Sequence, residues 1–341
     1  MNPITFYCGF DTHLKFSEIN AANQRLRPLN SMLVNDSCAK TESVYIGWCA
    51  LFVKTNDNKL IYISYNSPLV PKSEVITCNI NAVDKIKLIE CGTKSTFVLF
   101  KDFTLKKWPT FDFSEEPIEV KDIVTNGEEV KDISVGTTFV CVLLNDGRVK
   151  GMDEDGSVVT FECPETFAAV ACGNEHMLML SENGVVYSYG RGSKGQLGHG
   201  TVEDVFEEAK VIEALEGVKI IQIATGSWHS MALSSIGDVY VWGWNESGQL
   251  GLKKEEVNIK TIPTLLETKE ETMFNFVSCG SRHSMAISNG KLFGWGWNKW
   301  GQLAMDEKQF STCDQPTNII CQLDVKSVTC KYWSTVVHCI H

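Results

Sequence analysis

Hydrophobic and polar residues alternate along much of the chain, in short runs that meet at glycine-containing turns. The stretch HSMALSSIGDVYVW, residues 229–242, contains an alternating run, a turn at Ser-Ile-Gly and a second alternating run. Alternation with a period of two is typical of strands, and a tight turn between two such runs predicts a hairpin. No long segment with a helical period interrupts these runs, so the pattern predicts an all-β fold.

Three stretches of this kind superimpose, beginning at Val170, Ile223 and Val277. Each has an anchor glycine, a histidine three residues later, a turn glycine, a third glycine and a Gly-Gln-Leu triplet, at nearly constant spacing. The anchors are Gly173, Gly226 and Gly280, and the histidines are His176, His229 and His283. Four landmarks that keep register with the anchor in three copies indicate a structural repeat.

Fainter copies extend the series in both directions. They place Gly47, Gly92 and Gly136 at the anchor, and Lys331 takes the place of the glycine in the last copy. Seven anchors at this spacing predict a seven-bladed β-propeller of four-stranded antiparallel blades. Ala50, Ser95 and Phe139 stand where the histidine would, which predicts some shortened blades between 40 and 165.

The two ends of the chain predict how the ring closes. The last copy stops after its inner strands, and the N-terminal ITFYCGFDTHLKF has the character of the missing strands. We therefore expect one domain over 1–341, in which residues 1–16 complete the blade formed by 320–341. In particular, 5–9 should pair with the sheet formed by 324–340, which removes exposed sheet edges.

Composition narrows the class of protein. The formal net charge of −11 opposes non-specific attraction to nucleic acid or anionic lipid. No window is apolar enough to span a membrane and no secretory leader is evident, so we expect a soluble intracellular protein that binds neither nucleic acid directly nor membranes. The 13 cysteines form no metal-spaced cluster, and Cys91, Cys172 and Cys279 are interpreted as small buried core residues.

The landmarks Gly-x-x-His, turn glycine, Val-Tyr-x-Trp-Gly and Gly-Gln-Leu-Gly resemble the repeat of the regulator of chromosome condensation family, whose members are seven-bladed propellers. The resemblance is strong over about 167–305. ATGSWHSMALSSIGDVYVWGWNESGQLGL, SCGSRHSMAI and FYCGF are moreover similar to one small member of that family. This similarity implies a nuclear, chromatin-associated adaptor, with a cytoplasmic pool, that binds a jumonji-type 2-oxoglutarate oxygenase acting on histone lysine or protein arginine.

The family's founding member is a guanine nucleotide exchange factor with a basic N-terminal tail for nucleosomes. Here the N-terminus is strand-like and lacks a basic cluster, so we expect contact with histones only through the partner. The alternative function is nucleotide exchange on a Ran-like GTPase, with 253–272 as the element that would enter the nucleotide site. Its mixed charges are more typical of a solvated connection.

The residues just before each repeat histidine differ between copies, as the rim of a binding surface would. Tryptophan and arginine are frequent anchors of protein interfaces. The predicted partner-binding residues in these turns are Glu175, Trp228, Arg282 and Trp333, and a later loop adds Arg191, Lys299 and Trp300. Trp244 and Trp297 share one repeat position and are interpreted as structural. The alternative for the turn tryptophans is packing between blades.

Other candidate chemistry is weaker. The three repeat histidines could be imagined as metal ligands, but residues at one position of successive blades are more often buried and satisfy backbone groups. The acidic run 112–132 could receive a basic partner, although such runs are more often solvated. Gly190, Gly192 and Gly195 spell G-x-G-x-x-G without a following helix, and Gly192 is interpreted as incidental. No catalytic motif is present, so we expect no enzymatic activity. We also expect a monomer that binds neither a cofactor nor a metal.

Overall fold

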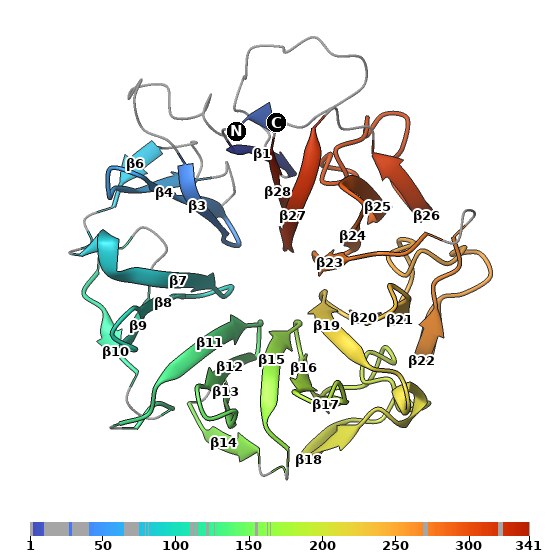
Figure 1. Ribbon diagram of the computed structural model, residues 1–341, viewed down its shortest axis with the longest axis horizontal. Coiled ribbons are helices and arrows are strands. Elements are labelled where there is room, and N and C mark those ends of the chain that lie inside the picture. The colour runs from blue at the N-terminus through green and yellow to red at the C-terminus, as the bar shows by residue number, and fades with distance from the viewer. Residues whose placement is uncertain are drawn as a thin grey trace.

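In the computed structural model, seven four-stranded antiparallel sheets stand around a central channel (Figure 1). The structure describes residues 3–9, 27–28, 41–64, 75–78, 80, 82–109, 113, 115–120, 123–125, 127–153, 156–161, 163, 165–268, 272–319 and 323–340. The first strand of each repeat lies innermost and the later strands follow outward (Figure 1). The predicted seven-bladed propeller is confirmed.

Six blades are continuous in sequence. In each, the strands follow in chain order from the innermost to the outermost. Blade 1 contains β3 (Thr41–Ile46), β4 (Ala50–Thr55), β5 (Leu60–Ser64) and β6 (Val75–Thr77), blade 2 contains β7 (Ile86–Cys91), β8 (Thr96–Phe100), β9 (Leu105–Trp108) and β10 (Ile118–Glu119), and blade 3 contains β11 (Val130–Val135), β12 (Phe139–Leu144), β13 (Val149–Asp153) and β14 (Val158–Phe161). Blade 4 contains β15 (Phe167–Cys172), β16 (His176–Ser181), β17 (Val186–Gly190) and β18 (Val205–Val211), blade 5 contains β19 (Ile220–Thr225), β20 (His229–Ser234), β21 (Val239–Trp244) and β22 (Ile259–Leu265), and blade 6 contains β23 (Phe276–Cys279), β24 (His283–Ser288), β25 (Lys291–Trp297) and β26 (Thr312–Ile319). Short 3₁₀ helices occur at η2 (Val83–Lys85) and η3 (Glu213–Leu215).

Blade 7 joins the two ends of the chain. Its inner strands are β27 (Asp324–Lys331) and β28 (Ser334–Ile340), and its outer strands are β1 (Pro3–Gly9) and β2 (Arg27–Pro28). β1 pairs antiparallel with β28, from Pro3 opposite Ile340 to Gly9 opposite Ser334. Ring closure by strands from both ends is thus confirmed, and 10–16 lie outside the described residues. The extent of one domain over 1–341 stays a prediction.

The core is distributed between the blades. The described buried residues form seven apolar clusters, and each cluster draws side chains from two neighbouring blades. At the closure point, Tyr7 and Val336 of blade 7 pack with Leu51 and Ile63 of blade 1. This arrangement follows from the sequence pattern, because a sheet in a ring buries both faces and a single blade cannot bury them alone.

The expected shortening of blades between 40 and 165 is confirmed: these blades keep all four strands, but strands such as β10 are short. One expectation needs correction. Cys91 and Cys279 are buried as expected, whereas Cys172 is only half-buried. Within the described residues, no helix combines the length and apolar character that crossing a bilayer requires.

Candidate protein-interaction surface

Three of the predicted binding residues, Glu175, Trp228 and Arg282, lie two positions after an anchor glycine, and close packing leaves no room for a side chain at these glycines. A Cβ atom on Gly226 would lie 2.5 Å from the carbonyl oxygen of Gly280 in the next blade and 2.0 Å from Cε1 of His229. Such distances exclude any larger residue, so the glycine is required for space. Three further anchors have an equally crowded Cβ position: Gly136, Gly173 and Gly280.

These turns and the later loops lie on one face of the ring. In blade 5, His229 at the end of the first turn pairs with Gly243, after which the long loop 245–258 begins. The same register joins His176 to Gly190 and His283 to Gly296. We call this side, with the turns 173–175, 226–228, 280–282 and 331–333 and the loops 191–204, 245–258 and 298–311, the loop face.

Five side chains of blades 4, 5 and 6 form one group on the loop face. Glu175 accepts a hydrogen bond from Nε1 of Trp228 at 3.3 Å and pairs with Arg191 at 3.1 Å. Trp228 meets Trp244 at 5.5 Å between ring centres, nearly perpendicular, and Arg282 lies over the Trp244 ring at 4.6 Å. These residues form the Trp228–Arg282 cluster, in which four of the predicted residues are brought together.

The remaining predicted residues form a second group across blades 6, 7 and 1. The ring of Trp333 lies 5.0 Å from that of Trp297 and 6.5 Å from that of Trp48. Trp300 lies 6.5 Å from Trp297, and Lys299 lies over the Trp300 ring at 5.8 Å. Trp333 therefore packs between the rings of two neighbouring blades, as the structural alternative held, although it is only half-buried.

Sequence reasoning missed three aromatic members of these groups. Trp244 and Trp297, interpreted as structural, are half-buried and link the predicted residues, and Trp48 is exposed. The strand register places Arg191 where blades 5 and 6 have these two tryptophans. Trp48 follows the anchor Gly47, and that position in a faint copy was the available signal.

The repeat histidines connect blades and are not exposed to ligands. Nε2 of His229 lies 2.9 Å from Oγ of Ser284 in the next blade, and that hydroxyl donates to the carbonyl oxygen of Gln249. The imidazole must therefore donate to the hydroxyl. Burial lowers the pKa of His229 to about 3, with smaller effects from His283 and His176. His229 therefore bonds to a side chain of the next blade and not, as expected, to a backbone group. The described residues contain no group of three or more His, Cys, Asp and Glu side chains that could hold a metal ion.

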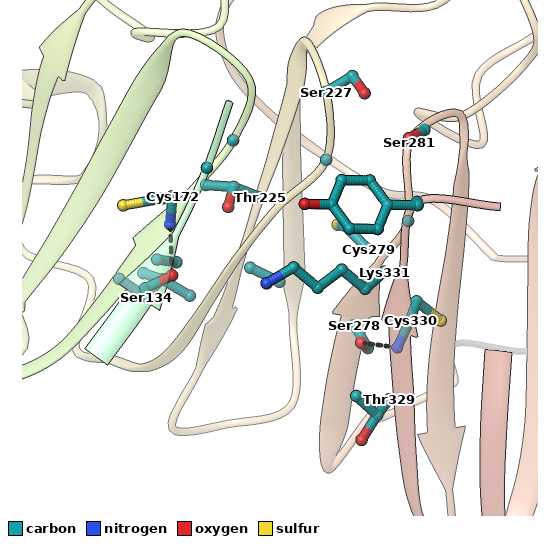
Figure 2. Close-up of a pocket in the computed structure, with 18 of the residues that line it drawn as sticks. Ser134, Cys172, Thr225, Ser227, Ser278, Cys279, Ser281, Thr329, Cys330 and Lys331 are labelled. Carbon is teal, nitrogen blue, oxygen red and sulfur yellow. Dashed lines mark hydrogen bonds between the residues drawn. The ribbon is translucent and has the colours of Figure 1, made fainter. Parts of the chain in front are cut away.

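The central channel is narrowed by residues that depart from the repeat. It encloses about 300 Å³, and Figure 2 shows Lys331 extending from β27 across it. Lys331 forms an ion pair with Glu90 of blade 2, and the hydroxyl of Tyr332 donates to the carbonyl oxygen of Cys91 at 2.7 Å. Because Lys331 replaces the anchor glycine, blade 7 can reach past blade 1 to blade 2.

The acidic run contributes less than its sequence suggested. Burial alone would raise the pKa of Glu128, but hydrogen bonds from Lys150 and Thr125 lower it to about 2. Asp132 is half-buried, and burial raises its pKa. These two carboxylates belong to local structure, while Asp112, Lys121 and Asp122 lie outside the described residues.

Two further segments singled out in the sequence, 253–272 and 190–195, are placed by the structure. β22 (Ile259–Leu265), the outer strand of blade 5, lies within 253–272, and 269–271 lie outside the described residues. Gly190 ends β17 and a loop follows it instead of a helix. The interpretation of Gly192 as incidental is wrong, because its Cβ would lie 1.9 Å from the carbonyl oxygen of Glu203.

Comparison with known proteins agrees with the repeat. The family described as "Regulator of chromosome condensation (RCC1) repeat" matches residues 183–233 and 237–287, and a second family of the same description matches 167–196 and 220–249. The chain is 38% identical to mouse RCC1 domain-containing protein 1 over 205 residues, which are 49% of this chain and 54% of that protein. The human protein of that name is 35% identical over 209 residues, with coverage of 49% and 55%. The chain therefore spans about half the length of these relatives.

Solved structures show the same fold over nearly the whole chain. Prp20p from Saccharomyces cerevisiae has a TM-score of 0.81 at 19% identity, with coverage of 99% of this chain and 92% of that one. Human WBSCR16 has a TM-score of 0.78 at 17% identity, with coverage of 99% of both chains. This chain is a seven-bladed β-propeller, and its residues 167–287 match the regulator of chromosome condensation repeat.

Proposed function

We propose that this chain is a non-enzymatic adaptor whose loop face binds a jumonji-type 2-oxoglutarate oxygenase and supports its action on chromatin. The observation that carries the proposal is the Trp228–Arg282 cluster. Its tryptophans and Arg282 are half-buried, so they are held in place by neighbours and still present surface to a partner. Pre-ordered aromatic and arginine side chains are the residues that most often dominate the energy of protein interfaces.

The identity of the partner rests on the similarity to RCC1 domain-containing protein 1. The yeast relative Prp20p has binding properties to Gsp1p and to histones. On our proposal the present chain meets histones through the oxygenase, in the nucleus, as a monomer, with a second pool in the cytoplasm. Its net charge of −11 disfavours direct contact with nucleic acid.

Affinity capture from nuclear extract tests the proposal. The wild-type chain should recover a jumonji-domain oxygenase, and Trp228→Ala should recover much less while its melting temperature falls by only a few degrees. Ile236→Ala is the matched control, because Ile236 is 64% exposed in the turn at the opposite end of blade 5. If folded Trp228→Ala captures the oxygenase as well as the wild type does, the cluster is not part of the interface. If the wild type captures no oxygenase, the proposed partner is wrong.

The second candidate function is guanine nucleotide exchange. A nucleotide-release assay with a Ran-like GTPase separates it from the adaptor. Substoichiometric amounts of the chain should leave the release rate unchanged on the adaptor proposal. Catalytic acceleration would contradict that proposal directly.

A further inference from the structure

A hollow of about 300 Å³ opens between blades 3 and 4, and aromatic rings form much of its wall. The ring of Tyr189 lies 4.9 Å from that of Phe161, 5.7 Å from that of Phe206 and 5.9 Å from that of Phe139, with interplanar angles of 77°, 88° and 70°. Rings set near right angles form corners instead of a flat stack. We call this hollow, with its four rings, the four-ring pocket.

The pocket exists because blade 3 lacks the long loop that blades 4, 5 and 6 have. In blade 4 the loop 191–204 places the carbonyl oxygen of Gln196 over blade 5, where it accepts hydrogen bonds from Ser230 and Trp242 at 2.9 and 2.8 Å. In blade 3 only 154–157 separate β13 from β14. Met177 and Tyr189, which occupy the positions of Ser230 and Trp242 in blade 4, therefore line an open pocket.

Two further departures from the repeat shape the same place. Phe139 stands where blades 4, 5 and 6 have the histidine, and Asp153 stands where they have the third glycine, since the two pair as His176 pairs with Gly190. Gly151 keeps the space open: a Cβ there would lie 3.1 Å from the Phe161 ring. The features that make blade 3 a faint copy are thus the features that build the pocket.

The charges at the pocket suit a cation. Two carboxylates, Asp153 and Glu175, line it together with one guanidinium, that of Arg191. Arg191 is ion-paired with Glu175 and its side chain is 59% exposed, whereas Asp153 is half-buried and accepts a hydrogen bond from the backbone of Ser157 at 2.8 Å. Aromatic faces attract cations, and quaternary ammonium groups are bound by enclosures of several rings.

We propose that the four-ring pocket binds the methylated ammonium group of a di- or trimethylated lysine presented by a partner polypeptide. Methyl groups reduce the hydration of the ammonium and fill an apolar wall, while the positive charge remains for the ring faces and the carboxylates. A polypeptide is the occupant because Glu175 and Arg191 belong both to the pocket and to the Trp228–Arg282 cluster. A chain lying on the loop face would pass the mouth of the pocket.

Peptide titration tests the proposal. The probes are a capped Ala-Ala-Lys-Ala-Ala peptide with unmodified or trimethylated lysine, the same peptide with a neutral tert-butyl analogue of trimethyllysine, and choline chloride. The trimethylated peptide should bind about tenfold tighter than the unmodified and the neutral peptides. Equal binding of the neutral analogue would show an apolar pocket without cation recognition. Choline as tight as the peptide would overturn the assignment to a polypeptide side chain, and no binding of any probe would overturn the whole proposal.

Two variants place the effect in the pocket. Phe206→Ala removes a ring that is 47% exposed and should abolish the preference for trimethyllysine without unfolding the blade. Phe310→Ala, at 50% exposure in the loop of blade 6, is the matched control and should retain it. Retained preference in Phe206→Ala would contradict the proposal. Because this readout is a peptide affinity, it can fail or succeed whether or not the oxygenase is captured.

Discussion

The guanidinium of Arg282 lies 4.6 Å from the centre of the Trp244 ring, and this contact joins blade 6 to blade 5 on the loop face. Arg282 also approaches Glu246 at 3.7 Å, a carboxylate that is 59% exposed. The arginine is therefore oriented by a ring beneath it and a carboxylate beside it. Its side chain remains 31% exposed, enough to meet a partner.

We expect Arg282→Ala to weaken binding of the oxygenase partner by about tenfold or more, because a pre-ordered arginine at an interface is a frequent hot spot. Arg282→Lys should fall between wild type and alanine, since lysine keeps the charge and loses the planar stacking on Trp244. A binding titration gives the order of affinities, and circular dichroism verifies the fold. Equal affinities for all three proteins would exclude Arg282 from the interface.

The Lys331–Glu90 ion pair should stabilise the closed ring. The two side chains are 20% and 23% exposed, so removal of one leaves the other charge partly desolvated. Lys331→Met and Glu90→Gln should each lower the free energy of unfolding by about 1–3 kcal/mol. The double variant should lose less than the sum of the two, which urea denaturation can measure. If the two losses in the free energy of unfolding simply add in the double variant, the interaction between Lys331 and Glu90 does not stabilise the fold.

The buried histidines predict acid sensitivity. Burial lowers the pKa of His176, His229 and His283 to about 3 in the folded state, while in the unfolded chain it is about 6.5. The unfolded state therefore binds more protons as pH falls from about 6.5 to about 3. Each histidine should lower the free energy of unfolding by about 1.4 kcal/mol per pH unit in that window, with no effect above it.

Urea denaturation between pH 7.5 and 5 measures this slope. His229→Gln removes one titrating ring and leaves a donor near Ser284, so its stability should depend less steeply on pH by about one proton. A slope identical to that of the wild type would show that His229 does not titrate on unfolding.

Alanine substitutions at two glycines should lower the stability of the fold by different amounts and for different reasons. Gly226→Ala would place a Cβ 2.0 Å from the His229 ring and should cost about 3 kcal/mol or more. Gly217 has a φ of +81° and nothing within 4 Å of a Cβ, so Gly217→Ala should cost only about 1 kcal/mol through backbone strain. Thermal melts of the two variants compare the effects, and similar melting temperatures would contradict the crowding at the anchor.

The ring was predictable because its determinants are local and repeated. The spacing of anchor, histidine and glycine marks each blade, and the strand-like ends of the chain mark the closing blade. Contacts between blades were not predictable in this way, because they join residues far apart in the chain. His229 donates to Ser284, some fifty positions away, and Trp244 owes its place in the surface group to Arg282 of the following blade.

The candidate surface was predicted in part for the same reason. Residues that vary between equivalent turns could be found by comparing copies, and Trp228 and Arg282 were found that way. Trp48, in a faint copy, was missed, because such copies keep few of the landmarks that make positions comparable. Phe139 and Asp153 stand where landmarks are lost, and together they border a pocket that the intact repeat would cover.

The pairing of β1 with β28 has a consequence for synthesis on the ribosome. β1 ends at Gly9, and its partner begins only at Ser334. At about 5–20 residues per second, the first strand waits roughly 20–60 s for the last one to emerge. For that interval its unpaired edge is open to other strands, so the nascent ring depends on whatever shields the earliest residues until the final blade is made.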